Sequence, residues 1–364
     1  MSNYSNKDQT FFKKITLDFN INDTTESMGI KMVKKQIINE RVERNLRVLK
    51  LLSNNDPSIN EEQKRVMLNE YSGWGGLREA IFTPSIYRQL KCYLTDDEIN
   101  ALKNTTKSAY YTPELLVKFI WSIVVIHGFD GGAILEPAAG NGIFIDNIPQ
   151  LIVKTCKVQA VEMDLLTCKI LMQKHPQIKL TVAPFENLHF SEEKYNLIIS
   201  NPPYSNQLVE DIYYKDLSHL AIHHFFVAKC ARLLKNNGII AMVLPQFFLD
   251  NVREHARDII TADGVNILVA YRLPDNIFAN AKITVDIVIL QKAATNIKWQ
   301  KTRNITIGEH NKPINEYFVE NPAHILGELE VVPMYNRMGI TCKATGDLRE
   351  KLKAIFLALK NKNK

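Results

Sequence analysis

The sequence predicts an open, doubly wound α/β domain built on a mostly parallel seven-stranded sheet. Seven short runs rich in aliphatic and β-branched residues follow one another between residues 133 and 292. Each run is almost continuously apolar, as in strands whose two faces are both covered. Helical segments alternate with the runs, which is typical of parallel sheets. Ligands of such folds bind beyond the carboxyl ends of the strands, so residues that directly follow a strand are the candidates for a functional site.

Length and composition are those of a globular protein. The chain has 364 residues, of which 46% are hydrophobic and 23% are charged, and this excludes wholesale disorder. The longest apolar stretch, Phe119 to Ile126, is far shorter than the roughly 20 residues of a membrane helix. The first residues lack the apolar run of a signal peptide. We therefore expect a cytoplasmic protein with no membrane partner.

The cysteines indicate neither a disulfide framework nor a metal site. There are five of them, an odd number, and no two have the C-x-x-C spacing of a zinc ligand pair. We expect reduced thiols and no bound metal.

Charge is distributed unevenly along the chain. Residues 1–108 carry 17 Lys or Arg and 14 Asp or Glu, residues 109–290 carry 15 and 18, and residues 291–364 carry 13 and 7. Basic ends around an acidic centre suit a protein whose flanks contact a polyanion while its centre holds a cationic or neutral small molecule. Chance variation among solvated faces is the alternative interpretation.

The region before the sheet, residues 1–106, is predicted to be a mainly helical domain that contacts DNA. After a polar, aperiodic arm of about 25 residues, apolar residues recur at helical spacing from Met28 to Leu52. A second helix is predicted from Glu61 to Asn69. The basic residues that fall mostly off the apolar stripe of the first helix are Lys34, Lys35, Arg41, Arg44 and Arg47.

A glycine-rich segment, YSGWGGLREAIF, follows from Tyr71 to Phe82. Three glycines around Trp74 exclude a regular element and predict a tight turn that presents or buries the indole. A buried structural turn is the default interpretation.

The elements of the sheet domain follow in order from residue 107 to 292. Thr112, Pro113 and Glu114 predict a helix start, with Thr112 as the N-cap and Pro113 as the first helical residue. The predicted strands are residues 133–138, 157–164, 178–185, 195–204, 238–245, 265–274 and 284–292.

The loop after the first strand, EPAAGNGIF from Glu136 to Phe144, has the character of a cofactor loop. Gly140 and Gly142 let the backbone turn sharply and approach a ligand. It is neither a Walker loop nor a full G-x-G-x-x-G motif. It resembles the first motif of S-adenosylmethionine-dependent methyltransferases.

Acidic residues and a methionine complete the predicted cofactor site. Glu162 ends the second strand, 22 residues after Gly140, which is the separation at which an acid accepts both ribose hydroxyls. We expect Glu136 to meet the ammonium or sulfonium charge of the cofactor, and Met163 to cover its adenine. An ordinary acid at a strand end is the alternative for Glu162.

The fourth strand ends in Asn201, Pro202, Pro203 and Tyr204, the most specific pattern in the chain. Proline has no N–H and fixes φ, so nearby carbonyls can point away from the sheet. The side-chain oxygen of Asn201 and the backbone oxygen of Pro202 would accept the two N–H bonds of a planar amine. Tyr204 offers a ring on which a heterocycle stacks. No general base is needed, because a sulfonium methyl transfers in line and the proton leaves afterwards; proximity and electrostatic preorganisation provide the catalysis. A plain Pro-Pro turn is the alternative.

With both motifs, the chain from about Lys107 to Lys292 resembles adenine-N6 DNA methyltransferases in which the cofactor motif precedes the N-P-P-Y motif. The resemblance implies a Rossmann-like fold, S-adenosylmethionine as cofactor, and methylation of DNA, as in restriction-modification. It further implies roles for individual residues. The implied cofactor-binding residues are Tyr111, Thr112, Glu136, Ala138, Gly140, Gly142, Glu162, Met163, Phe185, Glu186 and Asn201. Phe278 resembles the late motif that packs, with Tyr204, against an extruded base.

The flanks resemble a narrower group. EYSGWGGLREAIF and residues 315–330 are similar to the methylase module of very large methylase–helicase proteins of phages and mobile elements. Residues 293–364 are expected to form a small basic extension in which Lys298, Lys301 and Arg303 contact the DNA backbone. The expected partner is double-stranded DNA, with a homodimer or a specificity partner left open.

Three other functions remain open at this stage. N-P-P-Y also occurs in methyltransferases that act on RNA adenine or on a protein glutamine amide, although Ser205 stands where the glutamine enzymes usually have an apolar residue. A partner-dependent, non-catalytic DNA-binding subunit is the third. The intact Asn201, Pro202 and Tyr204 argue against it.

Overall fold

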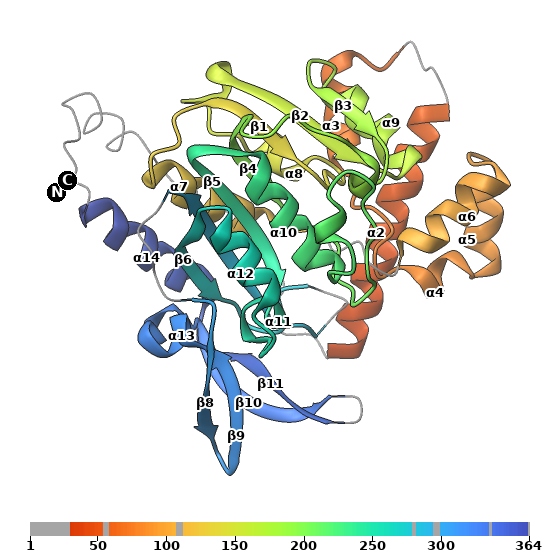
Figure 1. The fold of residues 1–364 in the computed structure, drawn as a ribbon. Helices are drawn as coiled ribbons and strands as arrows, with labels where there is room; N and C mark the ends of the chain where they lie inside the picture. Colours follow the sequence, from red (N-terminus) through yellow and green to blue (C-terminus); the bar gives the residue numbers. More distant parts are fainter. Residues whose placement is uncertain are drawn as a thin grey trace.

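The computed structural model describes residues 30–53, 58–106, 112–278, 282–293, 299–334 and 337–362 of the chain. Its centre is a seven-stranded sheet in the order β3-β2-β1-β4-β5-β7-β6 (Figure 1). The strands are β1 (Gly132–Glu136), β2 (Cys156–Glu162), β3 (Lys179–Val182), β4 (Tyr195–Ser200), β5 (Leu234–Pro245), β6 (Val265–Arg272) and β7 (Val285–Lys292). Strand β7 is antiparallel to β5 and β6, and the other pairs are parallel. The predicted fold class is confirmed, and each strand overlaps its predicted run.

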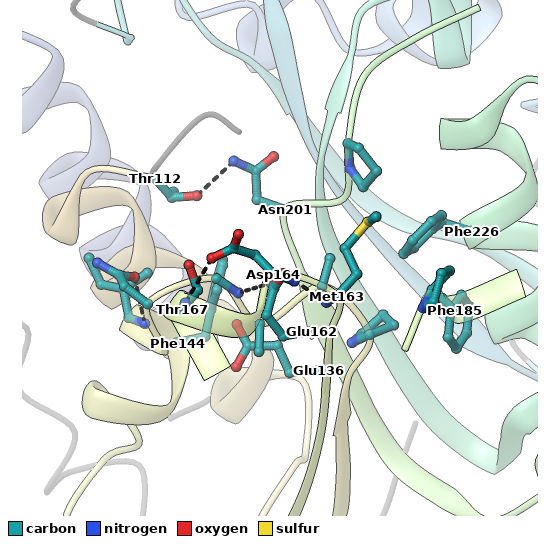
Figure 2. A pocket seen from close by; sticks show the side chains of 18 of the residues that line it. Thr112, Glu136, Phe144, Glu162, Met163, Asp164, Thr167, Phe185, Asn201 and Phe226 are labelled. Carbon is teal, nitrogen blue, oxygen red and sulfur yellow. Dashed lines mark hydrogen bonds between the residues drawn. The ribbon is translucent and has the colours of Figure 1, made fainter. Parts of the chain in front are cut away.

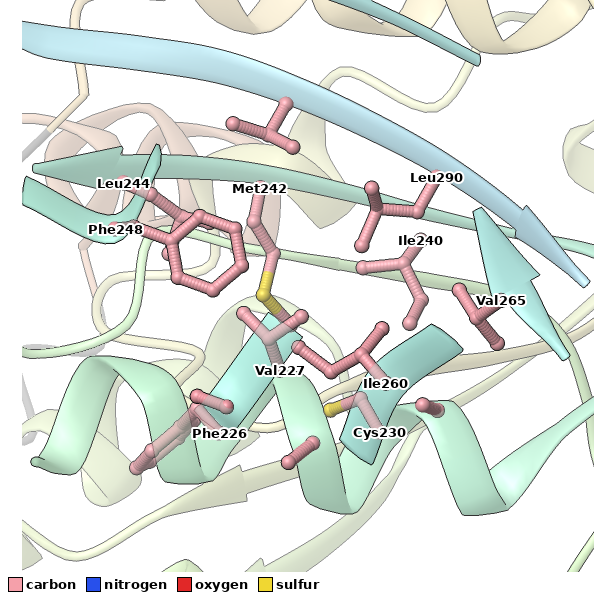
Figure 3. Packing of buried hydrophobic residues seen from close by; sticks show 14 of the residues in the cluster. Phe226, Val227, Cys230, Ile240, Met242, Leu244, Phe248, Ile260, Val265 and Leu290 are labelled. Atoms are coloured by element: carbon pink, nitrogen blue, oxygen red, sulfur yellow. The ribbon is translucent and has the colours of Figure 1, made fainter. Parts of the chain in front are cut away.

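Helices cover both faces of this sheet because both faces are apolar. One face packs against α7 (Glu114–Ile126) and α8 (Ile143–Asp146). The other packs against α10 (Ile222–Leu233) and α12 (His255–Ala262); Figure 3 shows Val227 and Ile260 from these helices close to Met242 of β5. The remaining elements here are α9 (Leu165–Lys174), α11 (Phe247–Asp250) and the 3-10 turns η1 (Val153–Thr155), η2 (Phe185–Asn187) and η3 (Lys215–Leu217).

The N-terminal helices form a third hydrophobic core that packs against α9. They are α2 (Ile30–Ser53), α3 (Glu61–Asn69), α4 (Arg78–Ile81), α5 (Pro84–Lys91) and α6 (Asp96–Thr105). Their buried residues share a cluster with Leu166 and Ile170 of α9. The helices predicted over 28–52 and 61–69 are confirmed as α2 and α3, and Asn60 and Gln63 form a capping box at the start of α3. The predicted N-terminal arm lies outside the described residues.

The C-terminal residues form two hairpins and a helix that the sequence analysis did not anticipate. The hairpins are β8 (Thr302–Ile307) with β9 (His310–Asn315), and β10 (Gly327–Met334) with β11 (Arg337–Ala344). Between them lie α13 (Glu316–Glu320) and η4 (Pro322–His324). The final helix, α14 (Leu348–Lys362), inserts Leu352 into the core beside α7. This region therefore covers part of the sheet domain.

The start of α7 differs from the prediction. Pro113, with φ −57° and ψ 140°, occupies the N-cap position, and Glu114 is the first helical residue. The hydroxyl of Thr112 does not cap the helix; it accepts a hydrogen bond from Asn201 Nδ2 at 3.0 Å. The register is shifted by one residue because Thr112 is drawn toward the end of β4.

Among the helices of the described ranges, none has both the length and the apolar character needed to cross a membrane.

A buried ion pair ties two loops to α10. Lys229 Nζ lies 2.6 Å from Asp211 Oδ2, and both side chains are fully buried. The same ammonium donates to the carbonyls of Phe185 and Leu188, both at 2.8 Å. Burial lowers the pKa of Lys229, and the Asp211 carboxylate opposes that shift. All three donors of the ammonium are therefore used, so the interior charge is balanced.

Lys229→Met should destabilise the fold by about 3–5 kcal/mol, because it leaves the Asp211 carboxylate buried without its counter-charge. The matched control is Lys169→Met, which removes an exposed ion pair with Glu98 and should cost no more than about 1 kcal/mol. Urea unfolding at neutral pH measures both. Equal stabilities of the two variants would contradict the assignment.

Candidate active site

A cavity opens where β1, β2 and β4 end, the edge at which ligands of doubly wound folds bind. It holds about 1110 Å³ of empty space, counting open solvent at its mouth. Figure 2 shows Glu136, Glu162 and Asp164 near one another within it. Its predicted lining residues are Thr112, Glu136, Ala138, Gly140, Glu162, Met163, Phe185, Glu186, Asn201 and Pro203. Residues that end or follow each of the strands β1, β2, β3 and β4 thus meet in one cavity.

The carboxylate of Glu162 fixes the loop after β1. Its Oε2 accepts a hydrogen bond from the Gly140 N–H at 2.8 Å, and its Oε1 accepts from the N–H groups of Met163 and Asp164, also at 2.8 Å. Burial raises the pKa of Glu162, and these backbone donors oppose the rise. Because each carboxylate oxygen has two lone pairs, Oε1 is used fully by its two donors, and Oε2 keeps one lone pair that can accept from a ligand hydroxyl.

The two loop glycines have different roles. Gly140 lines the cavity with φ 53°, a left-handed conformation that favours glycine. Gly142, with φ 80°, does not line the cavity; a Cβ there would lie 2.5 Å from Leu171 Cδ1. Gly142 therefore permits close packing of the loop against α9, and its predicted role in cofactor binding stays a prediction.

Glu136 is a buried acid without a complete set of partners. It is 1% exposed, and its Oε2 has no hydrogen-bond partner among the described residues. Burial and the negative charges of Asp146 and Glu162 raise the pKa of Glu136 well above its ordinary value. A cation placed against this carboxyl would ionise it and satisfy the free oxygen.

The cavity as a whole suits a cationic ligand. Four acidic side chains line it: Glu136, Glu162, Asp164 and Glu186. Among its described lining residues there is no Lys, Arg or His. The acidic centre inferred from the charge distribution is thus concentrated at this site.

An aromatic wall borders one end of the cavity. The rings of Phe185 and Phe226 lie 4.9 Å apart between centroids, and both line the cavity with Glu186. Met163 stands opposite them in Figure 2 and is 63% exposed. A flat heterocycle could lie between Met163 and the aromatic wall, with Glu186 as an acceptor for its amine.

Two residues of the N-P-P-Y motif, Asn201 and Pro203, line this cavity. Asn201 donates through Nδ2 to Thr112, while its Oδ1 accepts a hydrogen bond from the Tyr204 hydroxyl. That hydroxyl is also 3.0 Å from the Val243 carbonyl. The Tyr204 hydroxyl therefore donates to the same oxygen, Asn201 Oδ1, that is predicted to accept an N–H of the substrate amine. Pro202 is buried beside these residues.

Phe278 contacts Tyr204, as the resemblance implies. The ring centroids are 6.5 Å apart with an interplanar angle of 64°, and Phe278 is buried. Neither ring lines the cavity. Tyr204 and Phe278 thus pack together outside the cavity. Asn201 connects this pair to the cavity, because it lines the cavity and accepts a hydrogen bond from Tyr204.

Arg41 has a structural role. Its Nη2 lies 3.2 Å from the Ser72 carbonyl, 3.4 Å from the Gly73 carbonyl and 3.1 Å from the Gly75 carbonyl. The guanidinium holds the glycine-rich turn and is part-buried there. The predicted contact of Arg41 with a DNA phosphate stays a prediction.

The other basic candidates lie on the surface or outside the described residues. Arg47 pairs with Glu70, and Arg303 pairs with Glu316. Lys301 is exposed, and Arg44 is half-buried on α2. Four of the predicted site residues have side chains that the structure does not describe: the basic Lys34, Lys35 and Lys298, and the predicted cofactor-binding Tyr111.

Sequence reasoning missed part of the cavity wall. Tyr71, Trp74 and Leu102 of the N-terminal helical region line it, and so does Asn141 of the loop after β1. Trp74 is buried, so the predicted buried turn is confirmed. The glycine-rich segment signalled a special turn, but nothing in the sequence showed which surface that turn meets.

Residues 98–325 match the model of a protein family described as N-6 DNA methylase. Among curated proteins, Defense against restriction protein B of Escherichia phage P1 is 27% identical over 192 residues, which are 51% of this chain and 8% of the phage protein. Type II methyltransferase M.CvrRI of Paramecium bursaria Chlorella virus XZ-6E is 26% identical over 206 residues, 55% of this chain and 52% of the viral protein. The chain thus spans about half of one relative and a small part of the other.

A solved structure shares the fold over almost the whole chain. The type I restriction-modification system methyltransferase subunit from Streptococcus thermophilus superposes with a TM-score of 0.50 at 15% identity. The match covers 98% of this chain and 80% of that chain. At this identity the likeness shows the fold alone.

Glu162→Gln should destabilise the ligand-free protein by about 1–3 kcal/mol, because an amide turns a donor toward at least one backbone N–H that loses its acceptor. The control is Glu186→Gln on the same cavity, where the change should stay within about 0.5 kcal/mol. Urea unfolding of both variants at pH 8 makes the comparison. A Glu162→Gln protein as stable as the control would refute the role of this carboxylate.

Proposed function

Because the chain belongs to the N-6 DNA methylase family, we propose that it transfers the methyl group of S-adenosylmethionine to the exocyclic N6 amine of adenine in double-stranded DNA. The observation that carries the proposal is the meeting of Asn201 with the acidic cavity. We also propose the division into a helical region (1–106), a catalytic domain (107–292) and a C-terminal extension (293–364).

The residues of the cavity fit S-adenosylmethionine. This cofactor carries two positive charges, an ammonium and a sulfonium, and Glu136 offers a buried carboxyl oxygen without a partner in the described structure. Glu162 would accept a ribose hydroxyl through Oε2, and Met163, Phe185 and Glu186 would hold the adenine. When bound, the cofactor supplies a methyl group activated by attachment to the sulfonium.

Asn201 and its neighbours would hold the substrate amine. The Asn201 side-chain oxygen and the Pro202 carbonyl would accept the two N–H bonds of the adenine amine, which draws the nitrogen lone pair out of conjugation. For this, the Tyr204 hydroxyl must give up its hydrogen bond to Asn201. Tyr204 and Phe278 would then stack on the base, an interaction worth about 1–3 kcal/mol. An adenine inside a duplex must be extruded first, at a cost of a few kcal/mol.

We assign the DNA backbone contacts to basic residues of the N-terminal and C-terminal regions. Arg44, Lys301 and the predicted Lys34, Lys35 and Lys298 remain candidates, while Arg47 and Arg303 would first have to leave their acidic partners. The affinity that comes from phosphate contacts of this kind falls as the salt concentration rises. A homodimer or a separate specificity subunit stays compatible with this arrangement.

Asn201→Ala should lower methyl transfer at least about 100-fold, because it removes a polar contact made to the reacting amine. Affinity for S-adenosylmethionine should change only a few-fold. The assay follows labelled methyl groups into DNA, into RNA and into protein, and mass spectrometry of the nucleosides identifies N6-methyladenine. Asn304→Ala, on the exposed strand β8, is the control.

Near wild-type turnover by the Asn201→Ala variant would refute the role of the asparagine. Labelling of RNA or protein with unlabelled DNA would refute the proposed substrate while leaving the cofactor assignment intact.

Binding of S-adenosylmethionine should release a proton through Glu136. The raised pKa keeps this acid protonated above its ordinary pKa of about 4.3, and a cation beside it lowers the pKa again. Affinity should therefore rise with pH up to the raised pKa and level off above it. Calorimetry in phosphate and Tris buffers, repeated from about pH 5.5 to 8, measures the proton released.

Glu136→Gln should abolish this proton release, and Glu186→Gln should keep it. A binding enthalpy that is independent of the buffer at every pH tested would contradict the assignment of Glu136.

A further inference from the structure

The N-terminal helical region supplies part of the cavity wall. Tyr71, Trp74 and Leu102 line the same cavity as Glu136 and Gly140. The region is also joined to the loop after β1, because Asn141 Nδ2 donates to the Tyr71 carbonyl at 3.1 Å. A ligand in this cavity therefore meets side chains from outside the sheet domain.

Trp74 lines this cavity and carries a donor that no described residue uses. The side chain is 2% exposed, and its indole N–H has no acceptor among the described residues. The other two tryptophans give a comparison. Trp121 donates its indole N–H to the Phe144 carbonyl at 2.9 Å. Trp299, whose N–H also has no acceptor among the described residues, packs against Phe248 of α11 and does not line the cavity. Trp74 thus combines a buried, unused donor with a place on a ligand cavity.

The turn that carries Trp74 is fixed before any ligand arrives. Asn45 of α2 donates to the Gly73 carbonyl at 2.7 Å and accepts from the Ser72 N–H at 2.9 Å. Arg41 binds three carbonyls of the same turn. Gly73 has φ 63°, a conformation that favours glycine. Two side chains of one helix therefore hold the backbone on both sides of the indole, which is how binding sites are preorganised.

The charge of the cavity indicates which ligand atom the indole meets. An indole N–H only donates, and the charged side chains of the cavity are all acids, which only accept when ionised. Those acids suit the cationic and hydroxyl groups of S-adenosylmethionine but repel its carboxylate. That carboxylate needs donors, and the turn is anchored to Asn141 in the loop after β1, not to the aromatic wall around Phe185.

We propose that Trp74 donates its indole N–H to the carboxylate of bound S-adenosylmethionine, so that the helical region before the sheet completes the cofactor site. This inference rests on the proposed function, because it assumes that the cavity binds this cofactor.

The test compares two ligands by calorimetry. S-adenosylhomocysteine keeps the carboxylate, whereas 5′-deoxy-5′-methylthioadenosine retains only the nucleoside end. Trp74→Phe keeps an aromatic ring but removes the donor, and it should weaken S-adenosylhomocysteine at least roughly tenfold, as expected for a hydrogen bond to a charged group. Its affinity for methylthioadenosine should match that of the wild type. Trp299→Phe, which removes an equally unpartnered indole N–H elsewhere, should leave both affinities unchanged.

A second measurement is made on the wild-type protein, and the variant is needed only to assign one resonance. The three tryptophans give three indole ¹H–¹⁵N resonances, and the one absent from Trp74→Phe identifies Trp74. S-adenosylhomocysteine should shift this resonance downfield, as a new hydrogen bond does, and leave that of Trp299 in place.

Three outcomes separate the hypotheses. A wild-type protein that binds neither ligand overturns the proposed function itself. Binding of S-adenosylhomocysteine with an unmoved Trp74 resonance and unchanged affinity in Trp74→Phe overturns only the role of the indole. Equal weakening of both ligands in Trp74→Phe overturns the carboxylate as the acceptor.

Discussion

At the carboxyl edge of the sheet, one buried carboxylate collects three backbone N–H groups from two different chain segments. Glu162 ends β2, and through Gly140 it also holds the loop that leaves β1. Lys174 of α9 secures the other side of that loop by donating to the Asn141 carbonyl at 2.7 Å. The floor of the cavity is therefore fixed by short interactions between neighbouring strands. Glu136, which ends β1 and leads into this loop, and Asp164, which Glu162 holds directly, line the same cavity.

The sheet could be predicted because its signals are local. Apolar runs bounded by helical segments appear in the sequence whatever the tertiary partners are, and a Gly-rich loop or a Pro-Pro step has its conformational meaning on its own. The acid at the end of β2 was recognisable from its separation from Gly140. The first residue of α7 could not be predicted, because Thr112 forms a hydrogen bond with Asn201, 89 residues away.

Contacts between distant segments account for what the sequence did not reveal. Arg41 lies in a sequence pattern that is typical of a solvated basic face, yet its guanidinium donates to backbone carbonyls about 30 residues further along the chain. Trp74 lines a cavity whose other residues, apart from Tyr71, Leu102 and Thr112, begin only at Glu136. The C-terminal hairpins were missed because their strands alternate exposed and half-buried positions, as β8 does, with little of the continuous apolar character of the central strands. No local pattern encodes these pairings.

The position of β7 in the sheet has a consequence for synthesis of the protein. Strand β7 lies between β5 and β6 and is the last of the seven to leave the ribosome. Until residues 285–292 emerge, β5 has an open edge and β6 has no strand to pair with. An unpaired, apolar strand edge is a template for association with other chains. The nascent sheet is therefore most exposed to aggregation just before its last strand arrives, and a pause in translation at that point would prolong the exposure.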